Sequence, residues 1–317
     1  MTTSPLDNAT HDLLKQRVGA LHLRQRLGIE RDYEHRIFGQ GRTFFHVENW
    51  YSLRSIIRNS LRLVLLHGRA QRNARRIEVR HNHIRLAGLP DRFDNFTLLQ
   101  LSDLHIDMAE DFSHVLIEAV REVDYDLCVL TGDFRGDTYG PYEAALAGMR
   151  QLRSQLQGDV YAVLGNHDTI CMVPALEAMG IRMLLNEQVQ LQRDDQAIYL
   201  AGIDDPHYYR ADNIEKAGDA IPEGAASILL AHSPEIYRHA AHAGFDLMLC
   251  GHTHGGQICL PGGVPIMCNA GCPRDFCRGP WAYQDLQGYT SAGSGACVVD
   301  LRLNCPPEIT LHHLHCA

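Results

Sequence analysis

Two histidines lie one residue apart in the stretch LMLCGHTHGGQICLPGG, which covers residues 247–263. His252 and His254 follow a short apolar run and lie among glycines, which carry no side chain that could cover an imidazole. In an extended stretch, residues i and i+2 point the same way, so both rings can reach one centre. Glycine also lets backbone approach backbone, because it has no Cβ. The pattern predicts a metal-binding loop with room for ions and a substrate.

Four further blocks of metal-binding residue types follow apolar runs earlier in the chain. They are LSDLH with Asp103 and His105, TGDF with Asp133, GNHD with Asn166, His167 and Asp168, and AHSP with His232. Loops at one edge of a parallel sheet converge, so ligands far apart in sequence can form one cluster. A lone Asp-x-His or a lone histidine is weak evidence. Five ordered blocks, each after a predicted strand, indicate a metal centre.

The number of candidate ligands indicates how many ions are bound. Seven side chains are available: Asp103, His105, Asp133, Asn166, His232, His252 and His254. Seven are too many for one tetrahedral ion, whereas one bridging carboxylate would give each of two ions four contacts. Mixed nitrogen and oxygen ligation rich in histidine favours Mn²⁺, Fe or Zn²⁺ over Mg²⁺ or Ca²⁺. We expect two divalent ions per chain, and the ligand types do not choose among manganese, iron and zinc.

From residue 77 onward, short β-rich runs alternate with helical patterns. The predicted strands include FTLLQLSDLH, YDLCVLTGDF, DVYAVLGNHD, AIYLAGIDD, ASILLAHSP and FDLMLCGHTH, and the predicted helices are FSHVLIEAVREV and YEAALAGMRQLRSQL. Apolar runs of this kind are typical of strands buried on both faces, with helices outside. The fold class is therefore predicted to be α/β.

The charge of the chain divides it into a basic extension, residues 1–76, and an acidic body, residues 77–317. The extension holds 14 Lys and Arg against 6 Asp and Glu, while the body holds 15 against 32. A basic extension on an acidic body indicates that the extension meets something anionic.

Residues 50–66, WYSLRSIIRNSLRLVLL, predict a basic amphipathic helix. One face of this helix is apolar from Trp50 to Val64. Its flank carries three arginines at a spacing of four, Arg54, Arg58 and Arg62. Two aromatic residues, Phe44 and Phe45, lie just upstream. This pattern suits an anionic membrane surface, where arginine stems snorkel and apolar side chains enter the interface. The alternative is a helix that docks its apolar face on the body or on another subunit. Nucleic acid is not expected, because a repeated aromatic and glycine pattern is missing.

The composition indicates a soluble globular protein. The chain has 317 residues, of which 45% are hydrophobic and 21% charged. With no export signal and no apolar run of bilayer-spanning length, we expect a cytoplasmic protein whose ten cysteines are reduced. Cys268, Cys272 and Cys277 cluster without regular CxxC spacing, which favours ordinary buried thiols over a structural metal.

The ordered blocks DLH, GD, GNHD, H and GHTH resemble the calcineurin-like metallophosphoesterase superfamily, and the resemblance covers residues 77–317. GHTHGGQ followed by LPGG, and RLNCPPEIT at 302–310, look like a bacterial subgroup of membrane-associated phosphodiesterases. That subgroup includes the UDP-2,3-diacylglucosamine pyrophosphatases of lipid A synthesis. The resemblance implies two packed β-sheets flanked by helices, a metallophosphoesterase sandwich, with a binuclear metal centre at the sheet ends.

The resemblance also implies a role for each residue of the blocks. Three ligands would hold the first ion, three the second, and one carboxylate would bridge them: Asp103, His105 and His254; Asn166, His232 and His252; and Asp133. His167 would face the substrate as general acid or electrostatic stabiliser, and Asp168 would orient it. The sequence departs from the family pattern at GDFRGD, where Asp137 stands one position later than the usual second aspartate. The insert CNAGCPRDFCRGPW is also unusually rich in cysteine.

We therefore expect a metal-dependent hydrolase of phosphodiester or diphosphate bonds that forms no covalent enzyme intermediate. The amphipathic stretch favours a lipid-linked substrate such as UDP-2,3-diacylglucosamine, and peripheral contact with the cytoplasmic face of the inner membrane through residues 44–66. A soluble phosphodiesterase of cyclic or linear nucleotides fits the metal blocks equally well but leaves the basic helix unexplained. A scaffold with vestigial ligands is a third hypothesis. Whether His207 in DDPHYY lines the substrate cleft is left open.

Overall fold

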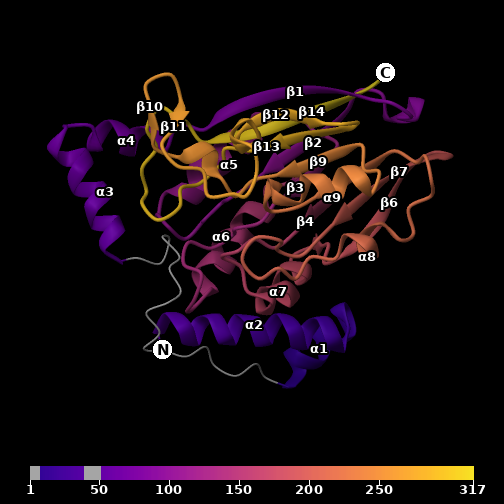
Figure 1. The fold of residues 1–317 in the computed structure, drawn as a ribbon, viewed down its shortest axis with the longest axis horizontal. Coiled ribbons are helices and arrows are strands. Elements are labelled where there is room, and N and C mark those ends of the chain that lie inside the picture. Colours follow the sequence, from indigo (N-terminus) through magenta and orange to yellow (C-terminus); the bar gives the residue numbers. More distant parts are fainter. Residues whose placement is uncertain (1–7, 39–50) are drawn as a thin grey trace.

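Two β-sheets pack face to face and helices cover their outer sides in the computed structural model, which describes residues 8–38 and 51–317 (Figure 1). The predicted α/β class with two packed sheets is confirmed. Within these described ranges, no helix is long and apolar enough to cross a membrane.

The first sheet has six strands in the order β1-β14-β2-β3-β4-β5. All neighbours run parallel except β14 and β2. The strands are β1 (Glu78–Leu86), β14 (Glu308–Cys316), β2 (Phe96–Leu101), β3 (Leu127–Leu130), β4 (Val160–Ala162) and β5 (Ile181–Met183).

The second sheet also has six strands, in the order β12-β13-β9-β8-β7-β6. Its inner neighbours are parallel, and the pair at each edge is antiparallel. The strands are β12 (Gly279–Tyr283), β13 (Leu286–Thr290), β9 (Leu247–Cys250), β8 (Ser227–Leu230), β7 (Gln196–Gly202) and β6 (Glu187–Arg193). A separate antiparallel hairpin consists of β10 (Cys259–Leu260) and β11 (Val264–Pro265).

The apolar runs of the sequence are buried on both faces, as predicted. Leu98 and Leu99 of β2 are both fully buried, but Leu98 packs between the sheets and Leu99 packs under the helices. Successive side chains of a strand point to opposite faces, so a strand between two cores has no polar side. The six strands predicted from residue 96 onward correspond to β2, β3, β4, β7, β8 and β9.

Helices cover the outer face of each sheet. The first sheet is covered by α5 (Phe112–Arg121), α6 (Glu143–Arg153) and α7 (Val173–Ala178), and the second by α8 (Ile214–Gly218) and α9 (Tyr237–His242). The apolar spacing in α5 explains its position, because Phe112, Leu116 and Val120 recur every four residues and are all buried.

The first two helices, α1 (Asn8–Val18) and α2 (Ala20–Phe38), pack along the side of the body that carries α7 (Figure 1). Leu14 and Leu23 are buried in the same core as the helices of the first sheet. Arg17 forms ion pairs with Glu177 and Glu187 of the body. This part of the basic extension therefore belongs to the packed structure.

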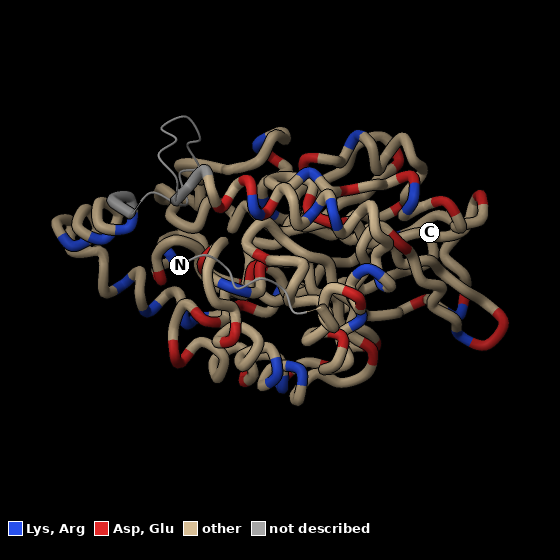
Figure 2. Tube along the Cα trace, turned by 90° about the horizontal axis from the view of Figure 1, so that it is seen from below, with Lys and Arg blue, Asp and Glu red and all other residues tan. Residues whose placement is uncertain are grey.

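The predicted amphipathic stretch forms α3 (Tyr51–Leu63), followed by α4 (His67–Asn73). These two helices lie at one end of the molecule, where Lys and Arg gather on them (Figures 1 and 2). Residues 51–76 contain seven arginines and no acidic residue. Leu61 packs with Val299 and Leu303, so part of the apolar face docks on the body. Phe44, Phe45 and Trp50 lie outside the described residues.

Candidate active site and metal centre

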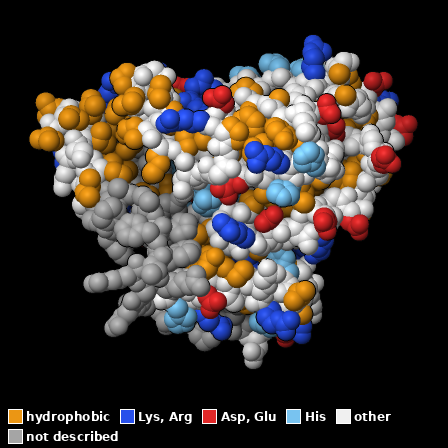
Figure 3. All heavy atoms as spheres, viewed as in Figure 1, with side chains coloured by type: hydrophobic (Ala, Val, Ile, Leu, Met, Phe, Trp, Pro, Cys, Tyr) orange, Lys and Arg blue, Asp and Glu red, His pale blue; other side chains and the backbone are white. Residues whose placement is uncertain are grey.

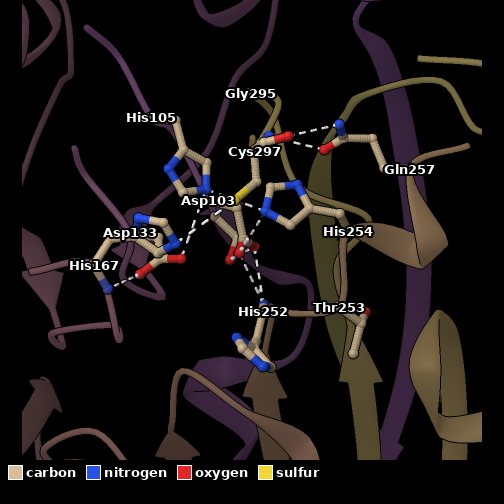
Figure 4. Close-up of polar contacts among 12 residues, drawn as sticks. Asp103, His105, Asp133, His167, His252, Thr253, His254, Gln257, Gly295 and Cys297 are labelled. Atoms are coloured by element: carbon tan, nitrogen blue, oxygen red, sulfur yellow. Dashed lines mark hydrogen bonds and ion pairs between the residues drawn. The ribbon is translucent and has the colours of Figure 1, made fainter. Parts of the chain in front are cut away.

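The five predicted blocks lie in loops at the carboxyl ends of five strands. The loops after β2, β3 and β4 come from the first sheet, and those after β8 and β9 from the second. Their side chains converge where the strands of the two sheets end, as Figure 4 shows for residues of the loops after β2, β3, β4 and β9. The seven candidate ligands are each at most 6% exposed, so the cluster is removed from bulk water.

One group of ligand atoms contains Asp103, His105, Asp133 and His254, all within 4.8 Å of one another. Nε2 of His105 lies 3.1 Å from Nε2 of His254 and 3.6 Å from Oδ2 of Asp133. Nε2 of His254 lies 3.4 Å from Oδ1 of Asp103. Two imidazoles and two carboxylates therefore face one point, which fits a divalent ion.

A second group contains Asp133, His232 and His252, again within 4.8 Å. Nε2 of His232 lies 3.4 Å from Oδ2 of Asp133, 3.2 Å from Nδ1 of His252 and 2.9 Å from Oδ1 of Asn166. The same Asp133 oxygen thus faces both groups. This is the position that a bridging carboxylate would require.

Hydrogen bonds to backbone carbonyls set which ring nitrogen of each histidine faces the centre. Nδ1 of His105 contacts the Arg135 carbonyl oxygen at 2.8 Å, and Nδ1 of His232 contacts that of Thr131 at 2.8 Å. Nε2 of His252 contacts the Asn269 carbonyl at 2.6 Å. Since a carbonyl accepts, each of these nitrogens donates, and the other nitrogen of each ring faces inward, where it can bind a metal once it carries no proton. Metal-binding histidines are oriented in this way.

Burial and neighbouring charge support the same assignment. Burial lowers the pKa of His105 to about 4, so this imidazole is neutral near pH 7. Burial opposes ionisation of Asp133, but His232 and His167 outweigh it and hold the pKa of that carboxyl well below its usual range. Burial likewise opposes a charge on His232, yet Asp133 raises its pKa to about 10. Surroundings that stabilise a proton on His232 would also attract a metal cation.

The backbone is strained where the candidate ligands lie. Asp103, His105, Asp133, His252 and His254 all have positive φ, between 39° and 71°. Side chains other than glycine rarely adopt this conformation, and such outliers gather at functional sites. Gly165 is needed for a different reason, since a Cβ there would overlap the Asp133 carboxylate.

Asp168 is fully buried and joins two of the metal loops. Its carboxylate accepts hydrogen bonds from the backbone N–H of Asp133 at 2.8 Å, Phe134 at 2.9 Å and Gly165 at 2.9 Å. These contacts position the Asp133 loop against the loop that carries Asn166 and His167. Asp168 therefore acts on the backbone of the site, whereas the sequence suggested that it orients the His167 ring.

His167 lies beside the first group, with its ring centroid 4.8 Å from that of His105. Its Nδ1 lies 3.4 Å from the Thr138 hydroxyl and its Nε2 lies 3.6 Å from Sγ of Cys297. The buried Arg135 donates to the His167 carbonyl oxygen at 2.5 Å. The side chain thus borders the candidate metal centre from the cavity side.

Two buried arginines that the sequence did not single out support the loops. Arg302 donates to the carbonyl oxygens of His254 at 3.0 Å and Ala292 at 2.7 Å, and its guanidinium lies 3.2 Å from Nδ1 of His254. Arg135 also donates to the carbonyl oxygens of Thr138 and Gly140. Arg302 lies in the motif RLNCPPEIT and Arg135 in GDFRGD. These two motifs are the sequence pattern from which the arginines could have been predicted.

Asp137 and His207 have other surroundings. Asp137 is exposed and accepts a hydrogen bond from Arg54 of α3 at 2.6 Å, so it links this helix to the Asp133 loop. The His207 ring packs on that of His252, with centroids 4.1 Å apart, and its Nδ1 lies 3.0 Å from Glu235. The His207 ring therefore packs against the ring of His252, which is a candidate ligand.

All ten cysteines are free of disulfides in this structure. Sγ of Cys272 lies 4.0 Å from that of Cys277, and Cys268 forms a side-chain hydrogen bond with Cys277. The cluster seen in the sequence is thus also a cluster in space.

An apolar cavity of about 410 Å³ opens from the metal centre toward α3. At its inner end lie Asp133, His167 and His254. At its outer end lie apolar side chains from α3, the hairpin segment and the 297–299 loop: Ile56, Ile57, Leu61, Ile266, Met267, Val298 and Val299. Pockets of this size and character bind small molecules. The cavity therefore connects the predicted amphipathic helix with the candidate metal centre.

The chain is similar to one described protein family and to several individual bacterial proteins. The profile of a family described as calcineurin-like phosphoesterase matches residues 96–256. The chain is 29% identical to the uncharacterized metallophosphoesterase YkoQ of Bacillus subtilis, over 78% of this chain and 93% of that protein. It is 30% identical to YkuE of the same organism, over 75% and 85%. It is 28% identical to the phosphodiesterase YaeI of Escherichia coli, over 74% and 87%.

Proposed function

We propose a substrate class for this chain, which belongs to the calcineurin-like phosphoesterase family and is a metal-dependent phosphoester hydrolase. The chain cleaves the phosphodiester or diphosphate bond of a lipid-linked substrate at a membrane surface. The observation that carries the lipid part is the apolar cavity between the metal centre and α3. An acyl chain would occupy the outer end while the phosphate lies at the inner end. UDP-2,3-diacylglucosamine is the most specific form of this proposal.

The ligand chemistry supports two ions. Asp103, His105 and His254 would hold the first, with Asn166, His232 and His252 at the second and Asp133 between them. Manganese is our first choice, with iron or zinc as alternatives. Divalent ions bound there would activate water and neutralise charge on phosphoryl oxygens.

The protein groups around the centre perform the remaining tasks. His167 borders the cavity, and if the Thr138 hydroxyl donates to its Nδ1, its Nε2 is the donor toward the leaving oxygen. Asp168 and Arg135 fix the backbone that presents this ring. Hydrolysis would proceed by direct attack of water on phosphorus.

The exposed apolar side chains support a membrane location. Among the described residues, eleven large hydrophobic side chains are exposed, and eight of them fall within residues 56–65 and 260–267. Figure 3 shows apolar side chains gathered at the end of the molecule that carries α3, α4 and the hairpin. The adjoining arginines would meet anionic head groups. This surface surrounds the outer end of the cavity, so a lipid-linked substrate would enter without leaving the bilayer surface.

The decisive experiment compares matched substrates with and without acyl chains. We would measure Mn²⁺-dependent hydrolysis of UDP-2,3-diacylglucosamine in mixed micelles, of UDP-glucosamine, and of a generic aryl phosphodiester. We expect Ile56→Glu to reduce turnover of the acylated substrate at least about 10-fold, because it places a charge in the cavity, while the aryl phosphodiester is still cleaved. Leu21→Glu, at an exposed apolar site on α2, is the matched control. Equal efficiency on acylated and unacylated substrates would instead favour a soluble nucleotide phosphodiesterase.

A further inference from the structure

A cysteine lies at the edge of the candidate metal centre, outside the seven ligands. Cys297 is half-buried, lines the cavity and points toward His167 and His105 (Figure 4). Ligand atoms of His105, His167 and Cys297 all lie within 4.8 Å of one another. These three side chains therefore form a third potential ligand group, of which only His105 belongs to the seven candidate ligands of the metal centre.

The spacing of the group matches a soft-metal site. Sγ of Cys297 lies 3.6 Å from Nε2 of His167. For Zn²⁺, bonds of about 2.3 Å to sulfur and about 2.05 Å to nitrogen at a tetrahedral angle place the two ligand atoms about 3.6 Å apart. Little movement would be needed for this pair to bind one ion.

The Gln257 side chain holds Cys297 in this position. Its Oε1 accepts from the Cys297 backbone N–H at 2.8 Å, and its Nε2 donates to the Cys297 carbonyl oxygen at 2.8 Å. Gln257 also donates to the Val299 carbonyl at 3.1 Å. Because Gln257 ends the GHTHGGQ loop, the thiol is fixed relative to His254. A preorganised ligand loses less entropy on binding, so the geometry is available to an ion.

We propose that Cys297, His167 and His105 form an inhibitory site for a thiophilic divalent cation such as Zn²⁺, distinct from the two positions that catalysis uses. The Cys297 thiol would release its proton to solvent as sulfur binds the ion, and the two imidazoles would bind as neutral ligands. The part of this inference that concerns inhibition rests on the proposed function.

Binding there would block catalysis in two ways. His105 can give its inward nitrogen to only one ion, so the first catalytic ion would lose a ligand. His167 would be bound to metal and no longer able to donate to the leaving oxygen. Mn²⁺ prefers oxygen and imidazole ligands, whereas thiolates select softer ions. The site would therefore let manganese support activity and excess zinc suppress it.

A spectroscopic test reads the site without any substrate. Co²⁺ added to the full chain should give a near-ultraviolet sulfur-to-cobalt charge-transfer band, which Cys297→Ser should remove. Cys272→Ser is the matched control, because it disrupts the other thiol cluster and should leave the Cys297 contribution in place. Gln257→Ala keeps the thiol but frees its loop, so it should weaken Co²⁺ binding. A band that survives in Cys297→Ser and disappears in Cys272→Ser would overturn the assignment.

Inhibition supplies the second readout. On Mn²⁺-loaded protein with an aryl phosphodiester, the Zn²⁺ concentration that halves the rate should rise roughly 10- to 100-fold in Cys297→Ser, as expected for loss of a metal-site interaction. Unchanged zinc sensitivity in this variant would refute the inhibitory role. If the Mn²⁺-loaded protein cleaved no phosphodiester, the proposed function would fail, while the cobalt spectrum would still decide whether the thiol site exists.

Discussion

The Asp168 carboxylate accepts a hydrogen bond from the Asp133 backbone N–H at 2.8 Å, which ties the candidate bridging ligand to the next metal loop. Asp168→Asn would turn one acceptor into a donor that faces buried N–H groups. We expect a loss of about 1–3 kcal/mol in the free energy of unfolding, together with weaker metal binding. Urea denaturation checks the first and metal titration the second. Asp137→Asn, at an exposed carboxylate, should change stability by no more than about 0.5 kcal/mol.

Asp133→Asn should reduce the metal content by more than any single histidine substitution. Asp133 faces both ligand groups, whereas His252 belongs to one of them. We expect Asp133→Asn to lose both ions and activity, and His252→Ala to keep one ion. Elemental analysis after dialysis against Mn²⁺ gives the number of ions per chain. A wild-type chain that holds fewer than two ions at saturation would contradict the binuclear assignment.

His167→Ala should separate catalysis from metal binding. His167 borders the cavity but is assigned to neither ion during turnover. We expect kcat to fall by about 10²- to 10⁴-fold, the usual contribution of a general acid, while metal content is retained. Steady-state kinetics with an aryl phosphodiester and elemental analysis on the same sample provide the two measurements. Undiminished turnover would show that another group assists the leaving oxygen.

His312 should make the folded state sensitive to acid. It is fully buried between the sheets, where Nε2 contacts Gln100 at 2.9 Å and Nδ1 contacts Asn82 at 3.0 Å. Burial lowers the pKa of His312 to about 3, below the value of about 6.5 in the unfolded chain. As the pH falls, the unfolded state therefore binds the proton at a higher pH than the folded state does. The contribution of neutral His312 to stability is complete above pH 6.5 and declines as the pH falls toward 3.

The measurement is urea denaturation of metal-free protein, in the presence of a chelator, at several pH values. Between pH 6.5 and 4, His312→Gln should flatten the slope of unfolding free energy against pH by up to about 1.4 kcal/mol per pH unit. Glutamine keeps a donor for Gln100 but does not titrate. Identical slopes in the two proteins would mean that the folded and unfolded states protonate His312 equally readily, which would contradict the lowered pKa.

Leu65→Glu should weaken binding to anionic vesicles. Leu65 is 90% exposed just after α3, in the most basic part of the described chain. A carboxylate there would oppose both insertion and attraction to anionic lipid. Co-sedimentation with vesicles containing phosphatidylglycerol, at low and at high salt, measures the effect. Leu21→Glu is the control, since Leu21 is 70% exposed on a different surface. Equal loss in both variants would argue against a specific membrane face.

The candidate metal centre could be predicted from the sequence because the pattern that indicates it is local. Each ligand follows an apolar run that reads as a strand, and parallel strands bring their carboxyl ends to a common edge. His252 and His254 were visible from their spacing alone. The same logic located β2, β3 and β4 within a few residues.

The residues that support the loops of the candidate metal centre could not be predicted, because their contact partners are distant in sequence. Arg26 reads as one more charge on a solvated helix, yet it is fully buried and its partner Asp204 lies 178 positions away. Arg302 donates to carbonyl groups that no side-chain pattern marks. Cys297 lies in SAGSGACVVD, where nothing in the spacing indicates that the thiol faces His167.

The guanidinium of Arg26 donates to the carbonyl oxygen of Asp168 at 3.0 Å and forms an ion pair with Asp204 at 3.3 Å. Glu30, one turn further along α2, accepts from the Thr169 hydroxyl and the Ile170 backbone N–H. Trimming the chain upstream of the sheets would therefore leave Asp204 buried without its counter-charge, at a cost of about 3–5 kcal/mol. A version that starts at residue 77 would lack these contacts, so the proposed membrane contact is better tested by point changes in α3 and directly after it.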